Sequence, residues 1–251
     1  MSLTSAINLL CDAVLSLVYP QGCAACGVRN VEARSDAPAC ADCWRATRVF
    51  TGVETLCWKC GALAQGDVPE GERGGVRCRR CEAEDFTAAR ACGIYEGALR
   101  AAVLALKREP FVSERLAGLL AAAQRREPLE SATLVVPVPL HAERERERGF
   151  NQAALLARAL SGRAGVRLDE WSLARVAGSV RHRAGMDARG RRETVEGAFE
   201  VARPRLVRGE RVLVVDDVFT TGATASACAA ALKAAGAREV FVLTVARAGP
   251  R

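Results

Sequence analysis

The stretch Arg211-Val-Leu-Val-Val-Asp-Asp-Val-Phe-Thr-Thr-Gly-Ala-Thr224 joins a strand-like segment to two carboxylates and a hydroxyl-rich turn. Four apolar residues, Val212 to Val215, predict a strand that is buried on both faces. The Ala-rich segment from Ala223 to Ala235 predicts a helix that ends before Gly236. The turn between the two elements is therefore the first candidate for a binding site.

This turn has the composition of a site for a sugar phosphate. At a helix N-terminus, free backbone N–H groups and the positive end of the helix dipole favour a phosphate. The residues in position to hold one are Thr220, Thr221, Gly222, Ala223 and Thr224. Asp216 and Asp217 precede them, and their carboxylates could bind Mg²⁺ and the 2- and 3-hydroxyls of a ribose 5-phosphate. The alternative, in which both acids only cap the helix, is disfavoured because one Asp would be enough.

Eight of the eleven cysteines form four CxxC pairs. A CxxC turn places two thiolates close enough to share one Zn²⁺ at about 2.3 Å per bond, and two such turns complete a tetrahedron. The sequence therefore predicts two structural zinc sites. In sequence order the quartets are Cys23, Cys26, Cys40 and Cys43, and then Cys57, Cys60, Cys78 and Cys81.

Other arrangements of the cysteines stay open at this stage. The two ribbons could be cross-braced, or the second could have lost its metal because of the long insert from Gly61 to Gly75. Disulfides are less favoured, because CxxC pairs in a chain without a signal peptide more often bind metal. The remaining cysteines, Cys11, Cys92 and Cys228, are predicted to be buried as small apolar side chains.

From Thr133 onward, strands and helices alternate as in a parallel sheet with helices on both faces. In such sheets the ligand lies beyond the carboxyl ends of the strands. The loop from Pro137 to Gly149 is one candidate there, although its run of alternating charges, residues 143–147, favours a solvated helical start. The loop from Arg175 to Arg192 is another, because it holds six arginines and one acid.

Two motifs resemble a known family. The run from Val214 to Thr224 resembles the phosphoribosyl pyrophosphate (PRPP) signature of type I phosphoribosyltransferases. Val136-Pro-Val-Pro-Leu140 and Arg148-Gly-Phe-Asn-Gln152, with the CxxC pairs upstream, are similar to the ComF family, also called ComF/GntX. The resemblance covers nearly the whole chain. It implies an α/β fold with a phosphoribosyltransferase-like parallel sheet flanked by helices, preceded by a small zinc-ribbon module.

The resemblance also implies roles for individual residues. Asp216 and Asp217 would hold the ribose and Mg²⁺, and residues 220–224 would hold the 5-phosphate. Arg183, or its neighbour Arg181, would neutralise a departing diphosphate from the flexible loop. The residues expected to face the diphosphate are Pro139, Leu140, His141 and Arg148. On our alignment His182 and Thr194 replace the usual Gln and Asn of the family, so contacts carried by those two side chains are not expected here.

The chain is expected to divide into three parts. Residues 1–19 place apolar side chains at helical spacing and predict an amphipathic helix that docks on the rest of the protein. Residues 20–86 form the double zinc ribbon, and residues 87–251 form the phosphoribosyltransferase-like part. No segment is long and apolar enough to span a membrane, and no signal peptide is evident, so we expect a cytoplasmic protein.

Two classes of function compete. The favoured one, implied by the resemblance, is a ComF-type factor in natural competence and DNA uptake. Such a factor would use its PRPP pocket for sensing or anchoring, handle single-stranded DNA and bind competence-machinery proteins. The net charge of +7 suits an anionic polymer, with Trp44 and Trp58 as the best stacking candidates. The alternative is a Mg²⁺-dependent phosphoribosyltransferase of unknown acceptor. The chain ends soon after its last strand, so no C-terminal hood is expected to read an acceptor.

Overall fold

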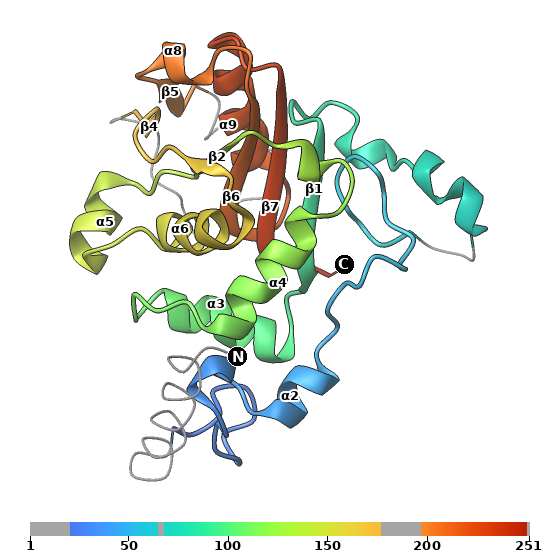
Figure 1. The fold of residues 1–251 in the computed structure, drawn as a ribbon, viewed down its shortest axis with the longest axis vertical. Coiled ribbons are helices and arrows are strands. Elements are labelled where there is room, and N and C mark those ends of the chain that lie inside the picture. The colour runs from blue at the N-terminus through green and yellow to red at the C-terminus, as the bar shows by residue number, and fades with distance from the viewer. Residues whose placement is uncertain (1–20, 65–67, 177–196, 250–251) are drawn as a thin grey trace.

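The computed structural model describes residues 21–64, 68–176 and 197–249 (Figure 1). The expected helix at residues 1–19 and most of the Arg-rich loop, including Arg183, lie outside the described residues.

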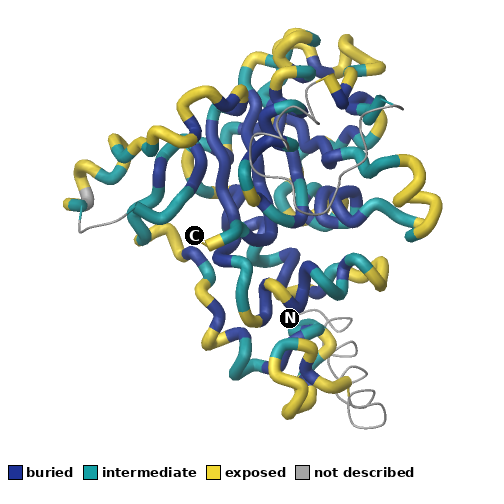
Figure 2. The backbone as a smooth tube through the Cα atoms, turned by 180° about the vertical axis from the view of Figure 1, so that it is seen from behind, coloured by how far each residue is buried: buried dark blue, intermediate teal, exposed yellow. Residues whose placement is uncertain are grey.

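A five-stranded parallel sheet forms the centre of the molecule (Figure 1). Its strands lie in the order β1-β7-β6-β2-β3, and each neighbouring pair is parallel. The strands are β1 (Ala88–Ile94), β2 (Leu134–Pro137), β3 (Arg167–Leu168), β6 (Arg211–Phe219) and β7 (Glu239–Arg247). Figure 2 shows the central strands buried, as expected for apolar runs covered on both faces. The predicted fold class is confirmed.

Helices cover both faces of this sheet. On one face, α3 (Gly97–Leu106), α4 (Glu114–Gln124) and α6 (Gln152–Ala164) pack in a single apolar cluster with side chains of β6 and β7. On the other face, α9 (Ala223–Ala234) packs in a second apolar cluster. Side-chain caps begin two of these helices, because Ser113 and Asn151 accept hydrogen bonds from backbone N–H groups of α4 and α6.

Shorter elements complete the fold. A small antiparallel pair, β4 with β5, stands beside α9. The short elements are η1 (Arg34–Asp36), α2 (Ala41–Ala46), η2 (Glu70–Gly75), η3 (Arg79–Cys81), η4 (Leu129–Ser131), α5 (Ala142–Arg148), β4 (Leu173–Arg175), β5 (Phe199–Val201) and α8 (Pro204–Val207).

The two cysteine ribbons join opposite faces of the sheet. We call the segment that carries Cys23 to Cys43 the first ribbon and the segment that carries Cys57 to Cys81 the second ribbon. The first ribbon shares its apolar cluster with α3 and α4, whereas the second shares its cluster with α9. In Figure 1 the first ribbon lies at the blue end below α3, and the second runs beside β1. Each ribbon is therefore part of the core of the molecule rather than a separate appendage.

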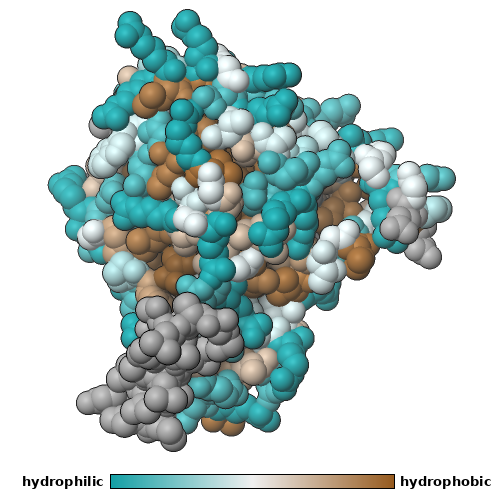
Figure 3. Space-filling model, in the orientation of Figure 1, coloured by the Kyte–Doolittle hydropathy of each residue, from teal (hydrophilic) through white to brown (hydrophobic). Residues whose placement is uncertain are grey.

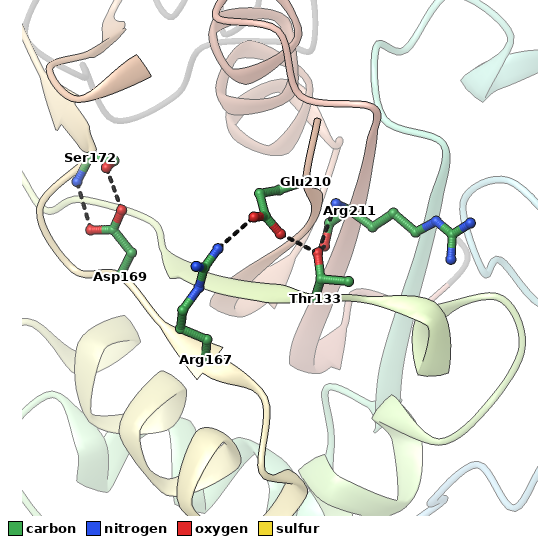
Figure 4. A network of polar contacts seen from close by, with 6 residues as sticks. All are labelled: Thr133, Arg167, Asp169, Ser172, Glu210 and Arg211. Carbon is green, nitrogen blue, oxygen red and sulfur yellow. Dashed lines mark hydrogen bonds and ion pairs between the residues drawn. The ribbon is translucent and has the colours of Figure 1, made fainter. Parts of the chain in front are cut away.

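A polar network joins the amino-terminal ends of β2, β3 and β6 (Figure 4). Glu210 accepts a hydrogen bond from the Thr133 hydroxyl at 2.5 Å and pairs with Arg167 at 2.6 Å. The Thr133 hydroxyl also accepts from the backbone N–H of Arg211 at 3.0 Å. The Thr133 bond and the Arg167 contact lower the pKa of Glu210. The network fixes the strand ends that lie opposite to the acidic motif.

The surface is mixed in character. Hydrophilic side chains cover much of the face in Figure 3, and apolar residues appear between them as separate patches. Among the large apolar side chains, Trp171 is 69% exposed. In the described part of the chain, no helix has the length and hydrophobicity needed to cross a membrane.

Candidate functional site

The acidic pair lies on β6 rather than after it. The sequence predicted a strand that stops before the two acids, but β6 continues to Phe219 because its pairing with β7 extends through Asp216 and Val218. Neighbouring side chains of a strand point to opposite faces, and here Asp216 is half-buried while Asp217 is 9% exposed. The Asp217 backbone N–H donates to Asp216 Oδ1 at 2.8 Å. The strand therefore holds both carboxylates in fixed positions.

The environment of Asp216 opposes the ionisation of its carboxyl group. Burial and the neighbouring Asp217 charge raise the pKa of Asp216 to about 8. A buried carboxyl with a raised pKa is typical of functional sites, because a ligand can then supply the compensating charge. Carboxylate oxygens are ligands that Mg²⁺ prefers, so the chemistry of either acid fits this cation.

The predicted phosphate loop lies at the start of α9. We use this name for residues 220–224, of which Gly222 precedes the first residue of α9. Gly222 has φ +89°, and a Cβ at this position would lie 2.9 Å from Phe219 Cζ, so a larger residue would be strained and crowded. Thr220 is exposed and Thr221 and Thr224 are half-buried. The loop thus presents hydroxyls and the N-terminus of a helix of twelve residues next to the acidic pair.

Sequence reasoning missed Lys107. This residue is the C-cap of α3, and its Nζ lies 3.5 Å from Asp217 Oδ2. Its charge lowers the pKa of Asp216, against the larger effects of burial and Asp217. Only three lysines stand among 33 arginines in the chain, yet one of them meets the acidic motif. No local pattern signals this contact, because α3 and β6 are more than a hundred residues apart.

Arg175 also lies within electrostatic reach of the acidic pair. Burial lowers its pKa, while the charge of Asp216 acts in the opposite direction. Its guanidinium lies over the Phe199 ring, 5.3 Å from the centroid, and its buried Nε has no hydrogen-bond partner among the described residues. The sequence placed Arg175 at the start of a loop, whereas the structure places it at the end of β4.

The first loop lies where the resemblance implies, after β2. Pro139, Leu140 and His141 are half-buried there. His141 caps α5, since its Nδ1 accepts from the Glu143 backbone N–H at 3.3 Å, and Arg148 donates to the Gln152 side chain at 2.5 Å. Residues 143–147 form the exposed helical start that their alternating charges predicted.

Helix ends occupy two positions at and just after the end of this loop. Gly149 has φ +79° and ends α5 in the left-handed conformation. Asn151 caps α6 through a 2.9 Å bond from the Ala153 N–H, and its side-chain amide donates to the Val138 carbonyl at 3.0 Å. These residue types are therefore explained by the tight turn between two helices, without a ligand.

All eight paired cysteines gather as predicted. Within each quartet the four sulfurs lie within 4.8 Å of one another. The quartets follow sequence order, so the cross-braced arrangement is wrong and the second ribbon keeps its full ligand set. They are Cys23, Cys26, Cys40 and Cys43, and Cys57, Cys60, Cys78 and Cys81.

The geometry of the quartets fits zinc better than disulfides. Sulfur–sulfur distances in the second quartet are 3.6 Å for Cys57–Cys81 and 3.6 Å for Cys60–Cys78. A tetrahedron with bonds of about 2.3 Å requires sulfurs about 3.8 Å apart, whereas a disulfide requires about 2.05 Å. The hydrogen bond with the Cys60 thiol lowers the pKa of Cys57 to about 4. Backbone hydrogen bonds from Cys60 and Cys78 act in the same direction, and burial acts against them. The hydrogen bond with Cys57 raises the pKa of Cys60, and burial raises the pKa of Cys81, so of these three cysteines only Cys57 favours the thiolate form without a metal.

The two ribbons repeat the same local structure. In each, a CxxCG turn ends in a left-handed glycine, Gly27 or Gly61, whose N–H donates to the carbonyl of the first cysteine at 2.8 Å. The first cysteine of the next pair then donates its N–H to that same cysteine's sulfur, at 3.2 Å for Cys40 and 3.3 Å for Cys78. The repetition explains why two short segments of different sequence adopt one geometry.

The family models divide the chain in the same way. Residues 14–82 match the model described as double zinc ribbon domain, and residues 147–250 match the model described as phosphoribosyl transferase domain. Among curated proteins, the chain is 32% identical over 218 residues to DNA utilization protein YhgH of Salmonella typhimurium, an alignment that covers 83% of this chain and 89% of that protein. The protein belongs to the ComF family.

Two further family relatives and one solved structure are informative. Competence protein F of Haemophilus influenzae is 35% identical over 133 residues. This alignment covers 50% of this chain and 55% of that protein, so the chain spans about half the length of this relative. Competence protein ComFC of Bacillus subtilis is 35% identical over 91 residues, 36% of this chain and 34% of that protein. Glutamine PRPP amidotransferase from B. subtilis, complexed with ADP and GMP, is 23% identical with a TM-score of 0.35, over 51% of this chain and 25% of that structure.

Of the two tryptophans predicted to stack on bases, Trp44 is buried in this ComF protein. Trp44 is 4% exposed, donates to the Asp36 carbonyl at 2.7 Å and lies under the Arg115 guanidinium, so it is not available to stack on a base. Trp58 is half-buried under Arg77, whose guanidinium carbon lies 4.5 Å from the ring centroid. The prediction for Trp44 is wrong because α2 turns this ring into the core of the first ribbon.

Proposed function

We propose that this ComF protein binds a ribose 5-phosphate group, free or as part of PRPP, at the end of β6. Residues 220–224 hold the phosphate, while Asp216 and Asp217 hold the ribose hydroxyls and Mg²⁺. Lys107 and Arg175 add positive charge nearby. Pro139, Leu140, His141, Arg148 and the loop residue Arg183 are the further candidates for contact with a diphosphate.

One observation carries this proposal. The adjacent acids Asp216 and Asp217 lie near the end of β6, and the chain runs from there through Gly222 into the N-terminus of α9. Carboxylates favour a divalent cation and the helix end favours an anion, and a Mg²⁺–sugar phosphate supplies both in one molecule. The two acids would not add to the stability of β6 by themselves.

Thermal unfolding with and without ligand tests the proposal. Ribose 5-phosphate or PRPP with Mg²⁺ should raise the Tm. At a ligand concentration of a hundred times the Kd, the free energy of unfolding should rise by about 2.7 kcal/mol. Asp217→Asn should remove the shift, whereas Glu200→Gln, an exposed acid on β5, should retain it. An unchanged Tm in the parent protein at saturating PRPP would reject the site.

We also propose a role in natural competence, on the cytoplasmic side, in which the protein handles incoming single-stranded DNA. The names of the relatives, competence protein and DNA utilization protein, support the biological setting. A physical feature supports the nucleic acid, because Arg77, Arg79 and Arg80 are exposed around Cys78, and Arg77 lies over the ring of Trp58. Clustered arginines next to an aromatic ring suit a single strand. Within this proposal, residues 20–86 form the ribbon module and residues 87–251 the phosphoribosyltransferase-like part.

Salt-dependent binding of single-stranded DNA tests this second part. Neutralising Arg77, Arg79 and Arg80 should flatten the plot of log affinity against log salt by about 0.7 for each DNA phosphate that the protein no longer neutralises. The matched control removes the same amount of charge at a different surface. It neutralises three exposed arginines in and beside α8, namely Arg203, Arg205 and Arg208. A third arm neutralises Arg181, Arg183 and Arg191, because the Arg-rich loop could carry the strand instead. Equal slopes in all variants would reject both surfaces.

The enzymatic alternative has its own readout. A phosphoribosyltransferase releases diphosphate from PRPP when its acceptor, a base or ammonia, is added. We expect ligand binding without such release, because the names of the relatives refer to competence and DNA rather than to a transfer reaction. Diphosphate release that depends on Asp217 would instead establish a transferase.

A further inference from the structure

The second ribbon shares its core with the phosphate loop. Cys57, Cys60 and Cys81 belong to the same buried cluster as Phe219 and Ala223. The first ribbon contributes Cys23 and Cys40 to the other cluster, on the opposite face of the sheet. Of the two quartets, the second alone thus shares its apolar cluster with the phosphate loop.

Two aromatic rings transmit this packing to Gly222. Phe86, five residues after Cys81, packs edge-on against Phe219, with ring centroids 5.8 Å apart and an interplanar angle of 81°. Gly222 fits against both rings, because a Cβ there would lie 2.9 Å from Phe219 Cζ and 3.6 Å from Phe86 Cε1. The segment that leaves the second quartet therefore sets the position of the residue that opens α9.

Arg247 connects the quartet to the same ring. It is the last residue of β7 and pairs with Phe219 in the sheet register. Its Nη1 donates to the carbonyl of Cys60, and its guanidinium lies over the Phe219 ring, 5.0 Å from the centroid. One side chain thus contacts the backbone of a cysteine of the quartet and the ring beneath the phosphate loop.

A third connection reaches the first turn of α9. The Asp85 backbone N–H donates to Ser226 Oγ at 2.8 Å, and that hydroxyl donates back to Asp85 Oδ2 at 3.0 Å. Ser226 also donates its own N–H to the Gly222 carbonyl at 2.8 Å. The chain between Cys81 and Phe86 is consequently fixed to the helix end that would hold the phosphate.

We propose that the second ribbon is a positioning element for the phosphate loop, with Arg247 and Ser226 as the coupling residues, so that metal in its quartet and sugar phosphate at the loop strengthen each other's binding. This inference rests on the proposed function, since it needs a sugar phosphate at the loop. Equilibrium coupling is reciprocal, so ribose 5-phosphate must raise the zinc affinity of the second quartet by the factor by which zinc raises the affinity for ribose 5-phosphate. The first quartet provides an internal reference, because its cluster lies on the other face.

Zinc competition on the full-length protein tests the coupling. The holoprotein is equilibrated with a chromogenic zinc chelator, with and without ribose 5-phosphate and Mg²⁺, and free thiols are then alkylated and located by mass spectrometry. We expect ribose 5-phosphate to protect the second quartet, with its apparent zinc affinity raised about fivefold or more. Protection of the first quartet should not change.

Two variants identify the connection. Arg247→Met keeps the length of the side chain but removes the bond to Cys60 and the stacking on Phe219, so the coupling factor should fall toward one. The matched control is Arg115→Met, since Arg115 lies 5.5 Å from the Trp44 ring in the first ribbon; it should leave the coupling factor unchanged. Ser226→Ala tests the same connection without altering the sheet and should also reduce the factor.

The outcomes separate the two proposals. No rise in the Tm of the parent protein with ribose 5-phosphate would reject the sugar-phosphate site and the coupling together. A normal rise in Tm, with both quartets protected equally or not at all, would reject the coupling alone. Coupling that survives both Arg247→Met and Ser226→Ala would overturn the assignment of these residues.

Discussion

At the scale of single residues, the site combines groups that are costly to bury. Asp216 is held with a pKa of about 8 by burial and by Asp217, and Lys107 offsets only part of this effect. The acids were predictable, because two carboxylates after an apolar run are rare without a ligand. Lys107 was not, because its contact depends on where α3 ends in space. Sequence pattern thus finds the groups that one segment carries, and misses those that folding brings from elsewhere.

Asp216→Asn should stabilise the protein in the absence of ligand and divalent cations. A carboxyl with a raised pKa in the folded state loses stabilising free energy as pH rises from the unfolded value of 3.8 through about 8. The variant should therefore gain about 0.5–2 kcal/mol at pH 8 and little at pH 4. Thermal unfolding at both pH values measures this, with Glu143→Gln as an exposed control. A loss of stability at pH 8 would show that Asp216 is ionised and satisfied in the free protein.

Lys107→Met should weaken ligand binding in a pH-dependent way. The Lys107 charge lowers the pKa of Asp216, so removing it raises that pKa and leaves more of the carboxyl protonated at neutral pH. The pH at which half of the ribose 5-phosphate thermal shift appears should move upward. Lys107→Arg should restore much of it, and Lys233→Met, at an exposed lysine of α9, should have no effect. A shift toward lower pH would contradict the assigned contact.

At the scale of elements, predictions succeeded where the pattern is long or the motif specific. The helix expected from Ala223 to Ala235 is found as α9, Ala223–Ala234. The end of β6 was placed too early, because pairing with β7, which carries the strand on to Phe219, is invisible in the segment itself. Gly149, at the end of the first candidate loop, is the left-handed C-cap of α5. Local sequence thus predicts that a turn is special without telling whether a helix end or a ligand makes it so.

Gly222→Ala should disturb the element that connects strand, loop and helix. A left-handed φ costs a residue with a Cβ about 1–2 kcal/mol, and the added carbon would meet the Phe219 ring. We expect a lower Tm and a smaller ribose 5-phosphate shift. The control is Gly118→Ala within α4, where nothing lies within 4 Å of the added Cβ and about 0.5–1 kcal/mol of stability should be gained. Equal Tm changes for the two variants would show that the turn tolerates a Cβ.

At the scale of the whole molecule, two metal quartets join opposite faces of one sheet. The first ribbon packs with α3 and α4, and the second packs with α9 and the phosphate loop. The CxxC spacing predicted two quartets but left their pairing open, because each short turn supplies only half of a metal site. It did not predict which face each ribbon covers, since that depends on apolar contacts such as Phe86 with Phe219. The same protein can therefore use chemically equivalent quartets for different structural purposes.

Zinc stoichiometry and selective removal of each quartet test this arrangement. Elemental analysis should find two zinc ions per chain, and Cys26→Ser or Cys78→Ser, each at a cysteine that is not fully buried, should leave one. Both variants should unfold at lower temperature, by about 2–4 °C for each kcal/mol of stability removed. Because only the second ribbon contacts the phosphate loop, Cys78→Ser should reduce the ribose 5-phosphate shift and Cys26→Ser should retain it. Fewer than one zinc per chain, with intact disulfides by mass spectrometry, would contradict the zinc ribbons. An equal decrease of the ribose 5-phosphate shift in both variants would contradict the claim that the second ribbon alone positions the phosphate loop.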